Sequence, residues 1–441
     1  MTSHNDIQDR RITSILHNID TLHRKGKVVE AYGTSIRVSG ISARIGQQCL
    51  VTDKINSHSI LADVVGLVGD NAILLPLGCL HGIAQDSEVT VVNEKSSVHF
   101  SESLLGRVLD GMGRPLDDKP LPSDLVDIPL YREAPSPLKR KIISDPFTTG
   151  VRAIDALLTL GVGQRTGIFA PAGGGKSTLL SMMAKQAVAD VIVIALIGER
   201  GREVGEFIEH ILTEDGLGRS VLIVSTSDRP AMERVKAAYT ATAIAEGYRS
   251  QGLNVLLLMD SVTRYARALR EIGLSVGETP VRRGFPPSVF AELPKLFERT
   301  GNDSNGTITA FYSVLMEDEE SNDPVAEEVR SLLDGHIVLT RKLAQENHYP
   351  AIDILKSSSR LVNQVTNKNH QANIGHFRSL LSKYGEIEFL LQVGEYEEGN
   401  DKLADEAVSK IQTMKRFLKQ NSGQCHTMDD VINEMRMIME E

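Results

Sequence analysis

The sequence predicts an α/β protein whose mostly parallel sheet follows a small β-barrel and precedes a helical domain. Short β runs with glycine and polar turns fill residues 27–95, apolar strands alternate with helices from 150 to about 350, and only helical periodicity remains beyond Ala351. A chain of 441 residues is long enough for two or three domains. We expect an N-terminal helix at 1–24, a barrel at 25–96, an α/β domain at 97–350 and a helical domain at 351–441.

The first segment has the pattern of an amphipathic helix. Apolar residues recur near helical spacing between polar ones: Ile7, Ile12, Ile15, Leu16, Ile19 and Leu22. The pattern fits either a helix that packs on its own domain or one that docks to a partner.

The barrel and its connector are predicted from turn and proline content. Six β runs are expected, at Lys27–Ala31, Ser35–Val38, Gln48–Val51, Ile60–Leu67, Ala72–Leu75 and Val89–Val92. Residues 106–148 are rich in glycine and proline, which predicts a long irregular crossover between domains.

The α/β block and the helical end follow from periodicity. Strands are expected at Thr166–Ala170, Val191–Ile197, Ser220–Ser225, Asn254–Met259, Thr307–Leu315 and His336–Leu339. Helical segments are expected at Ala372–Tyr384, Glu386–Val393, Lys402–Gln420 and Met428–Met439.

Composition narrows the class of protein. Hydrophobic residues at 41% and charged residues at 24% are typical of soluble globular proteins, and we find neither a membrane-spanning apolar run nor a signal peptide. Cys49, Cys79 and Cys425 have no metal-site or disulfide spacing, which suits a reducing cytosol. A net charge of −10 argues against a broad nucleic-acid surface.

The most specific motif is a glycine loop between an apolar strand and a helix. Three consecutive glycines allow backbone N–H groups to point at phosphate oxygens, and the helix N-terminus adds to that attraction. Lys176 is expected to reach the β- and γ-phosphates, and the Ser177 hydroxyl to ligate Mg²⁺. Ala170 stands where the usual pattern opens with glycine. The predicted nucleotide-binding residues here are Ala172, Gly173, Gly174, Gly175, Lys176, Ser177 and Thr178.

Two acidic residues end apolar strands of the same block. Asp260 follows Val255–Met259, where phosphate-loop enzymes hold the Mg²⁺ shell, although a strand-ending Asp is also a common helix cap. Glu199 lies in a glycine turn, where a carboxylate could activate water. The alternative is a surface acid paired with Arg200 or Arg202.

These motifs carry a family resemblance. In order along the chain, they resemble rotary ATP synthase catalytic subunits, and more closely the type III secretion (injectisome) ATPases and their flagellar-export sibling. The matching segments are Ala172–Thr178, Ile197–Glu203, Met259–Arg264, Arg282–Val289, Leu332–Leu343, His348–Asp353 and Gly394–Asp401.

The resemblance implies a RecA-like core, ATP and Mg²⁺ as ligands, and roles for individual residues. Glu199 would activate water, Arg264 would lie near the γ-phosphate, and Tyr349 would stack on the adenine. Arg360 would be an arginine finger that reaches into a neighbouring subunit's site. The alternative for Arg360 is a surface salt bridge.

The resemblance also implies a function. The chain would form a homohexamer that hydrolyses ATP to release chaperones, unfold export substrates and energise protein secretion. It would be cytoplasmic, peripheral to the inner membrane, and bound to regulator and stalk proteins of the apparatus. Alternatives are flagellar export, proton-driven ATP synthesis, a non-catalytic ring subunit that would lack the Glu199 carboxylate, and a Rho-like RNA translocase. The last would need aromatic residues in the barrel, where residues 27–95 hold Tyr32 alone.

Overall fold

The computed structural model describes residues 25–54, 58–93, 96–316 and 323–440. The helix predicted at 1–24 therefore lies outside the described residues. The chain divides into two compact units, an N-terminal one up to Ser96 and a larger one from Ser97 onward, with Ser275–Gly277 grouped with the first. None of the described helices is both long and apolar enough to span a membrane.

The N-terminal unit is a closed antiparallel barrel. Its strand order is β1-β2-β5-β4-β3-β6, and its interior is filled by side chains such as Ile36, Val38 and Leu74, all fully buried. Alternation of inward apolar and outward polar residues produces this one-sided core. The strands are β1 (Gly26–Tyr32), β2 (Ser35–Ser39), β3 (Gln48–Thr52), β4 (Ser59–Val68), β5 (Asn71–Pro76) and β6 (Glu88–Asn93).

The larger unit is built on a mostly parallel sheet. The strand order is β19-β18-β12-β17-β15-β13-β14-β8, with β16 paired to β17. The barrel and this sheet confirm the predicted fold class. The strands are β8 (Val108–Asp110), β12 (Arg165–Pro171), β13 (Val191–Glu199), β14 (Ser220–Thr226), β15 (Asn254–Asp260), β16 (Gly301–Asn302), β17 (Thr307–Met316), β18 (Gly335–Val338) and β19 (Ser358–Ser359).

Helices cover both faces of this sheet, so its central strands are mostly apolar on both sides. On β13, Val191 and Val193 face the core shared with α6, whereas Ile192 and Ile194 face the core shared with α3. The described helices here are α2 (Arg152–Leu157), α3 (Lys176–Gln186), α4 (Gly201–Glu206), η3 (Phe207–Leu212), α5 (Thr213–Gly218), α6 (Ala231–Ser250), α7 (Val262–Ser275), α8 (Pro287–Phe297), α9 (Pro324–Leu332), α10 (Arg341–Gln345) and α11 (Val362–Val365).

The connector predicted to be irregular is partly ordered into strands. β8 adds to the edge of the sheet beside β14, and β7 (Ser97–Phe100) pairs with β9 (Val126–Pro129). A further short pair joins β10 (Pro146–Phe147) to β11 (Leu160–Gly161), and single helical turns occur at η1 (Glu102–Leu104) and η2 (Pro137–Lys139). Strands this short carry too few residues to show alternation, so only pairing with a distant partner defines them.

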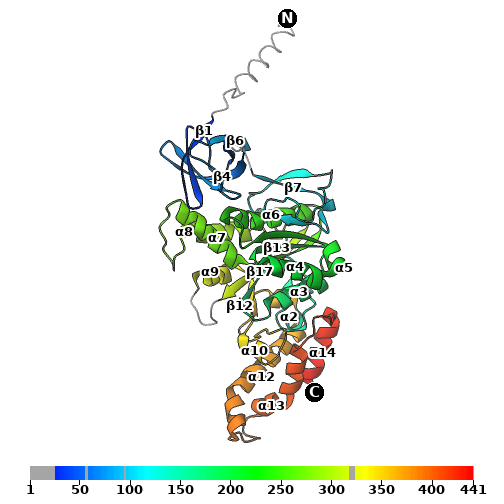
Figure 1. Cartoon of the computed structure of the whole chain (residues 1–441). Helices are drawn as coiled ribbons and strands as arrows, with labels where there is room; N and C mark the ends of the chain where they lie inside the picture. Colours follow the sequence, from blue (N-terminus) through cyan, green and yellow to red (C-terminus); the bar gives the residue numbers. More distant parts are fainter. Residues whose placement is uncertain (1–24, 55–57, 94–95, 317–322, 441) are drawn as a thin grey trace. The chain divides into compact units, whose positions relative to one another are not determined.

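The C-terminal region consists of α12 (Lys368–Val393), α13 (Lys402–Leu418) and α14 (Met428–Glu440), the orange and red helices of Figure 1. The two helices predicted on either side of Gly385 form the single helix α12, which corrects that prediction. A glycine inside a helix costs about 1 kcal/mol, and the packing of α12 against α13 and α14 offsets this cost. Buried Phe377 and Phe417 join these helices to the core beneath α2.

Candidate functional site

The predicted site residues converge at one edge of the parallel sheet. β12 leads into the glycine loop, β13 ends at Glu199, and β15 ends at Asp260. Because β13, β15, β17 and β12 are consecutive neighbours in the sheet, their carboxyl ends lie side by side. Parallel sheets generally bind ligands at this edge.

The glycine loop forms an open cradle at the start of α3. Gly173 and Gly175 have φ values of +78° and +81°, a conformation that side chains disfavour. A Cβ built on Gly173 would meet no atom within 4 Å, so space lies above the loop. No described side chain caps α3, and the first N–H groups of a helix lack intrahelical acceptors. The loop can therefore donate several N–H groups to an anion.

Charged side chains from the ends of β13 and β15 and from the first turns of α3 and α7 form a compact cluster beside the loop. Lys176 Nζ contacts a carboxylate oxygen of Asp260 and lies 3.7 Å from Oε1 of Glu199. Nε of Arg264 lies 3.3 Å from the same Glu199 oxygen. Ser313 Oγ on β17 donates to Oδ1 of Asp260 at 2.7 Å. Lys176 therefore pairs with carboxylates in this structure. When a nucleotide binds, its phosphate oxygens would compete for the same ammonium group.

Glu199 has the electrostatic environment of a general base. It is only 7% exposed, and this burial raises the pKa of its carboxyl group. Asp260 also raises this pKa, whereas Lys176 and Arg264 lower it. The effect of burial is larger than that of the two cations. A carboxylate with a raised pKa accepts a proton more readily.

A cavity of about 130 Å³ opens beside Glu199 and Asp260. We call it the catalytic cavity; its lining includes Ser177, Glu199, Asp260, Glu203 and Glu206. A serine hydroxyl and carboxylate oxygens are hard ligands of the type that Mg²⁺ prefers. The donor set of Ser177 and Asp260 therefore fits Mg²⁺.

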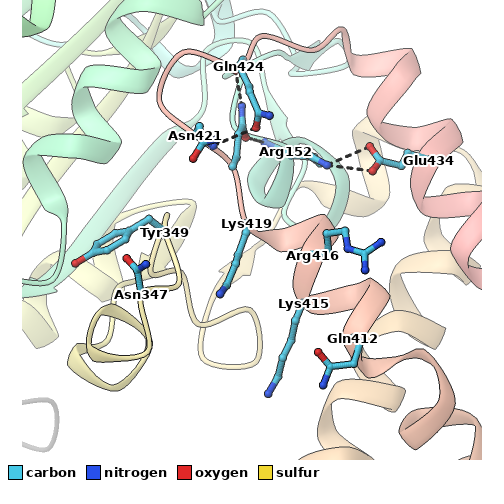
Figure 2. Close-up of a pocket in the computed structure, with 11 residues that line it drawn as sticks. Arg152, Asn347, Tyr349, Gln412, Lys415, Arg416, Lys419, Asn421, Gln424 and Glu434 are labelled. Carbon is cyan, nitrogen blue, oxygen red and sulfur yellow. Dashed lines mark hydrogen bonds and ion pairs between the residues drawn. The ribbon is translucent and has the colours of Figure 1, made fainter.

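A second cavity, of about 630 Å³, lies beside Tyr349. In Figure 2, Tyr349 and Asn347 share one loop and face Lys415, Arg416 and Lys419 across this Tyr349 cavity. The ring of Tyr349 also borders the glycine loop, since a Cβ built on Gly175 would lie 3.2 Å from its Cε1. Tyr349 therefore lies beside both the phosphate loop and a cavity large enough for a nucleotide base.

The cations of this cavity also affect a neighbouring histidine. The pKa of His348 is lowered to about 4 by burial, then by Lys419 and Lys415. His348 is accordingly neutral at pH 7, and it adds no further positive charge beside Tyr349.

Arg360 lies apart from this cluster. It is exposed, follows the outermost strand β19, and its Nη2 donates to the carbonyl of Arg330 at 3.4 Å. Among the described residues, Arg360 forms no ion pair with Glu199 or Asp260. The structure thus brings Lys176, Glu199, Asp260 and Arg264 together but leaves Arg360 free to contact another molecule.

The sequence did not predict two parts of the site, namely Ser313 and the residues around the Tyr349 cavity. Ser313 reaches Asp260 from the middle of an apolar strand, and a lone polar residue in such a strand is the one signal that could have pointed to it. The other residues that line the Tyr349 cavity, including Arg152 and Gln420, come from segments without any motif. No local signal in the sequence identifies them.

Comparison with known proteins places this geometry in context. The ATP synthase alpha/beta family, nucleotide-binding domain, matches residues 150–359, and the T3SS EscN ATPase C-terminal domain matches residues 366–437. A type 3 secretion system ATPase of Xanthomonas euvesicatoria is 50% identical, over 95% of this chain and 95% of the relative. A flagellum-specific ATP synthase of Bacillus subtilis is 47% identical, over 94% of each chain.

Solved structures agree with these relatives. The assembled ATPase EscN of the enteropathogenic E. coli type III secretion system aligns with a TM-score of 0.89 at 47% identity, covering 94% of this chain and 99% of that chain. EscN in complex with its central stalk EscO aligns with a TM-score of 0.86 at 46% identity, with the same coverage. These similarities confirm the resemblance that the sequence motifs indicate.

Proposed function

The chain belongs to the type 3 secretion system ATPases of the ATP synthase alpha/beta family, and from this premise we propose that its homohexamer hydrolyses ATP to energise protein export. The observation that carries the mechanism is the cluster of Lys176, Glu199, Asp260 and Arg264 next to a glycine loop, with Glu199 and Asp260 lining one cavity. In a non-catalytic ring subunit, a carboxylate at the position of Glu199 would be superfluous.

Each part of the cluster has a separate task in phosphoryl transfer to water. The loop N–H groups and Lys176 hold the β- and γ-phosphates, and on binding ATP Lys176 would exchange its carboxylate partners for phosphate oxygens. Ser177 and Asp260 would hold Mg²⁺, which neutralises phosphate charge when bound. Glu199 orients the attacking water and accepts its proton. Arg264 holds Glu199 in place and would lie near the γ-phosphate of bound ATP.

Tyr349 and Arg360 complete the site from two directions. The exposed ring of Tyr349 can stack on adenine when the phosphates occupy the neighbouring loop. Arg360, exposed at the sheet edge, would supply its guanidinium to the site of the next subunit, because a planar charged fork matches phosphoryl oxygens. The site would then be shared between two copies of the chain.

Replacing Glu199 by glutamine tests the assignment of the base. The amide preserves the shape but cannot accept a proton, so turnover should fall roughly 10²–10⁴-fold while ATP affinity changes little. Steady-state hydrolysis and equilibrium ATP binding measure the two quantities. Because burial raises the pKa of Glu199, parental turnover should also decline on the acidic side at a higher pH than an exposed glutamate would give.

Glu386→Gln is the control, because Glu386 lies on α12 outside the catalytic cavity and pairs with Lys383 on the surface. It should retain near-parental turnover. Equal loss of binding and hydrolysis in Glu199→Gln would show instead that Glu199 has a structural role.

The partners follow from the relatives. EscN has been solved with a central stalk, and we expect this chain to bind a stalk protein, a regulator, export chaperones and their substrates at the cytoplasmic face of the inner membrane. The match of residues 366–437 to a T3SS domain favours injectisome over flagellar export. The Bacillus subtilis relative keeps flagellar export as the second candidate.

Removing residues 1–20 tests the predicted docking helix. The catalytic cluster lies entirely within the unit that begins at Ser97, so ATPase activity should persist while association with the regulator or the membrane weakens. Co-purification with the regulator and vesicle flotation measure this association. Aggregation or unfolding of the truncated protein would show that the apolar stripe belongs to a domain core.

A further inference from the structure

Gln420 connects three separate segments around the Tyr349 cavity. It lies just after α13 and is 4% exposed. Its Oε1 accepts from the backbone N–H of Arg152 at 2.8 Å, and its Nε2 donates to the carbonyls of Gly150 and Gln424, each at 2.8 Å. Its own backbone N–H donates to the carbonyl of Tyr349 at 2.9 Å. One buried residue thus bonds the start of α2, the Tyr349 loop and the C-terminal wall of the cavity, by which we mean the lining residues between 412 and 434.

The chemistry of these bonds requires an amide. The side chain uses one acceptor and two donors at once, a combination that among residues of this length only glutamine offers. Glutamate would place an oxygen against two carbonyl oxygens, and methionine would fill the space without any of the three bonds. With methionine, the backbone N–H of Arg152 would lose its hydrogen-bond acceptor. This N–H belongs to the first turn of α2 and has no acceptor within the helix.

Arg152 makes a second set of contacts between the start of α2 and the same cavity wall. Its guanidinium pairs with Glu434 of α14 at 3.0 Å and lies over the ring of Phe417, 5.5 Å from the centroid. Figure 2 shows Arg152 reaching from the cavity toward Glu434. Displacement of Gln420 would therefore move the cavity wall relative to Tyr349 while leaving the glycine loop in place, because none of the hydrogen bonds of Gln420 reaches that loop.

We propose that Gln420 is a positioning residue for nucleotide binding, which fixes Tyr349 and the C-terminal wall at the spacing required by the base. The proposal rests on the proposed ATPase function. It separates recognition of the base, which depends on Gln420, from recognition of the phosphates, which depends on the glycine loop and Lys176.

The test compares Gln420→Glu and Gln420→Met with the parental protein in full-length form. Both should raise the KM for ATP roughly tenfold or more and leave kcat within about threefold. Equilibrium affinity for ATP should fall in parallel, whereas affinity for inorganic tripolyphosphate, which has no base, should stay within about twofold. A general loss of structure would weaken both ligands together.

Gln392→Met is the matched control, since Gln392 lies on α12 outside the Tyr349 cavity, is exposed and makes no side-chain hydrogen bond among the described residues. It should behave as the parental protein. Parental ATP affinity in the Gln420 variants, or parallel loss of ATP and tripolyphosphate, would overturn the proposal. Failure of both Gln420 variants to fold would also overturn it, by assigning Gln420 to the fold itself. Failure of the proposed ATPase function is distinguishable, because the parental protein itself would then not hydrolyse ATP.

Discussion

Lys176→Ala should reduce ATP turnover by roughly 10²–10³-fold or more. Lys176 supplies the ammonium group at the start of α3, and no other described cation lies within the ion-pair cluster of Asp260. Without it, the charge that develops on the β- and γ-phosphates loses a partner, and Asp260 loses the lysine with which it pairs. Phosphate release by the purified, correctly folded variant measures the loss.

Lys185→Ala provides the control, because Lys185 is an exposed lysine on the same helix, more than two turns further on. It should hydrolyse ATP at the parental rate. Thermal unfolding of both variants should confirm that each is folded. A Lys176→Ala protein with close to parental turnover would exclude the glycine loop as the catalytic phosphate site.

Arg360→Ala should also abolish turnover, by roughly 10³-fold or more, while ATP affinity and ring assembly persist. The reason is the placement of Arg360 at the outer strand, away from the cluster around Glu199 in its own chain. If it acts on the neighbouring subunit, specific activity of the parental protein should rise with concentration as rings assemble. Arg360→Lys should remain strongly impaired, since lysine keeps the charge but not the planar fork.

Mixing two inactive variants separates this shared site from a surface role. A ring that contains both Lys176→Ala and Arg360→Ala subunits has some interfaces with an intact loop and an intact finger. Partial activity should therefore return on mixing. The control is Arg436→Ala, because Arg436 is exposed and its ion-pair partner Glu440 lies 4.0 Å away. This variant should leave activity unchanged. Normal turnover by Arg360→Ala, or flat specific activity down to monomer concentrations, would refute the shared site.

Local sequence patterns predicted most of the architecture. The barrel strands and the central strands of the sheet lie within one or two residues of the predicted ranges, because alternation of apolar residues and glycine turns reports directly on a strand's surroundings. The predictions fail where local signals are weak or ambiguous. β8 is too short to show a period, and Gly385 resembles a helix end although α12 continues through it.

The sequence by itself determined the phosphate loop and the acids at the ends of β13 and β15. Glycine spacing and apolar runs are local properties, and parallel strands bring their carboxyl ends to one edge. Only the tertiary structure shows that Ser313 donates to Asp260 and that Arg360 lies away from the charged cluster around Glu199. The same holds for the hydrogen bonds of Gln420 with Arg152 and Tyr349. These contacts join segments up to 268 residues apart. They depend on how whole helices and strands pack, which no periodicity within a single segment records.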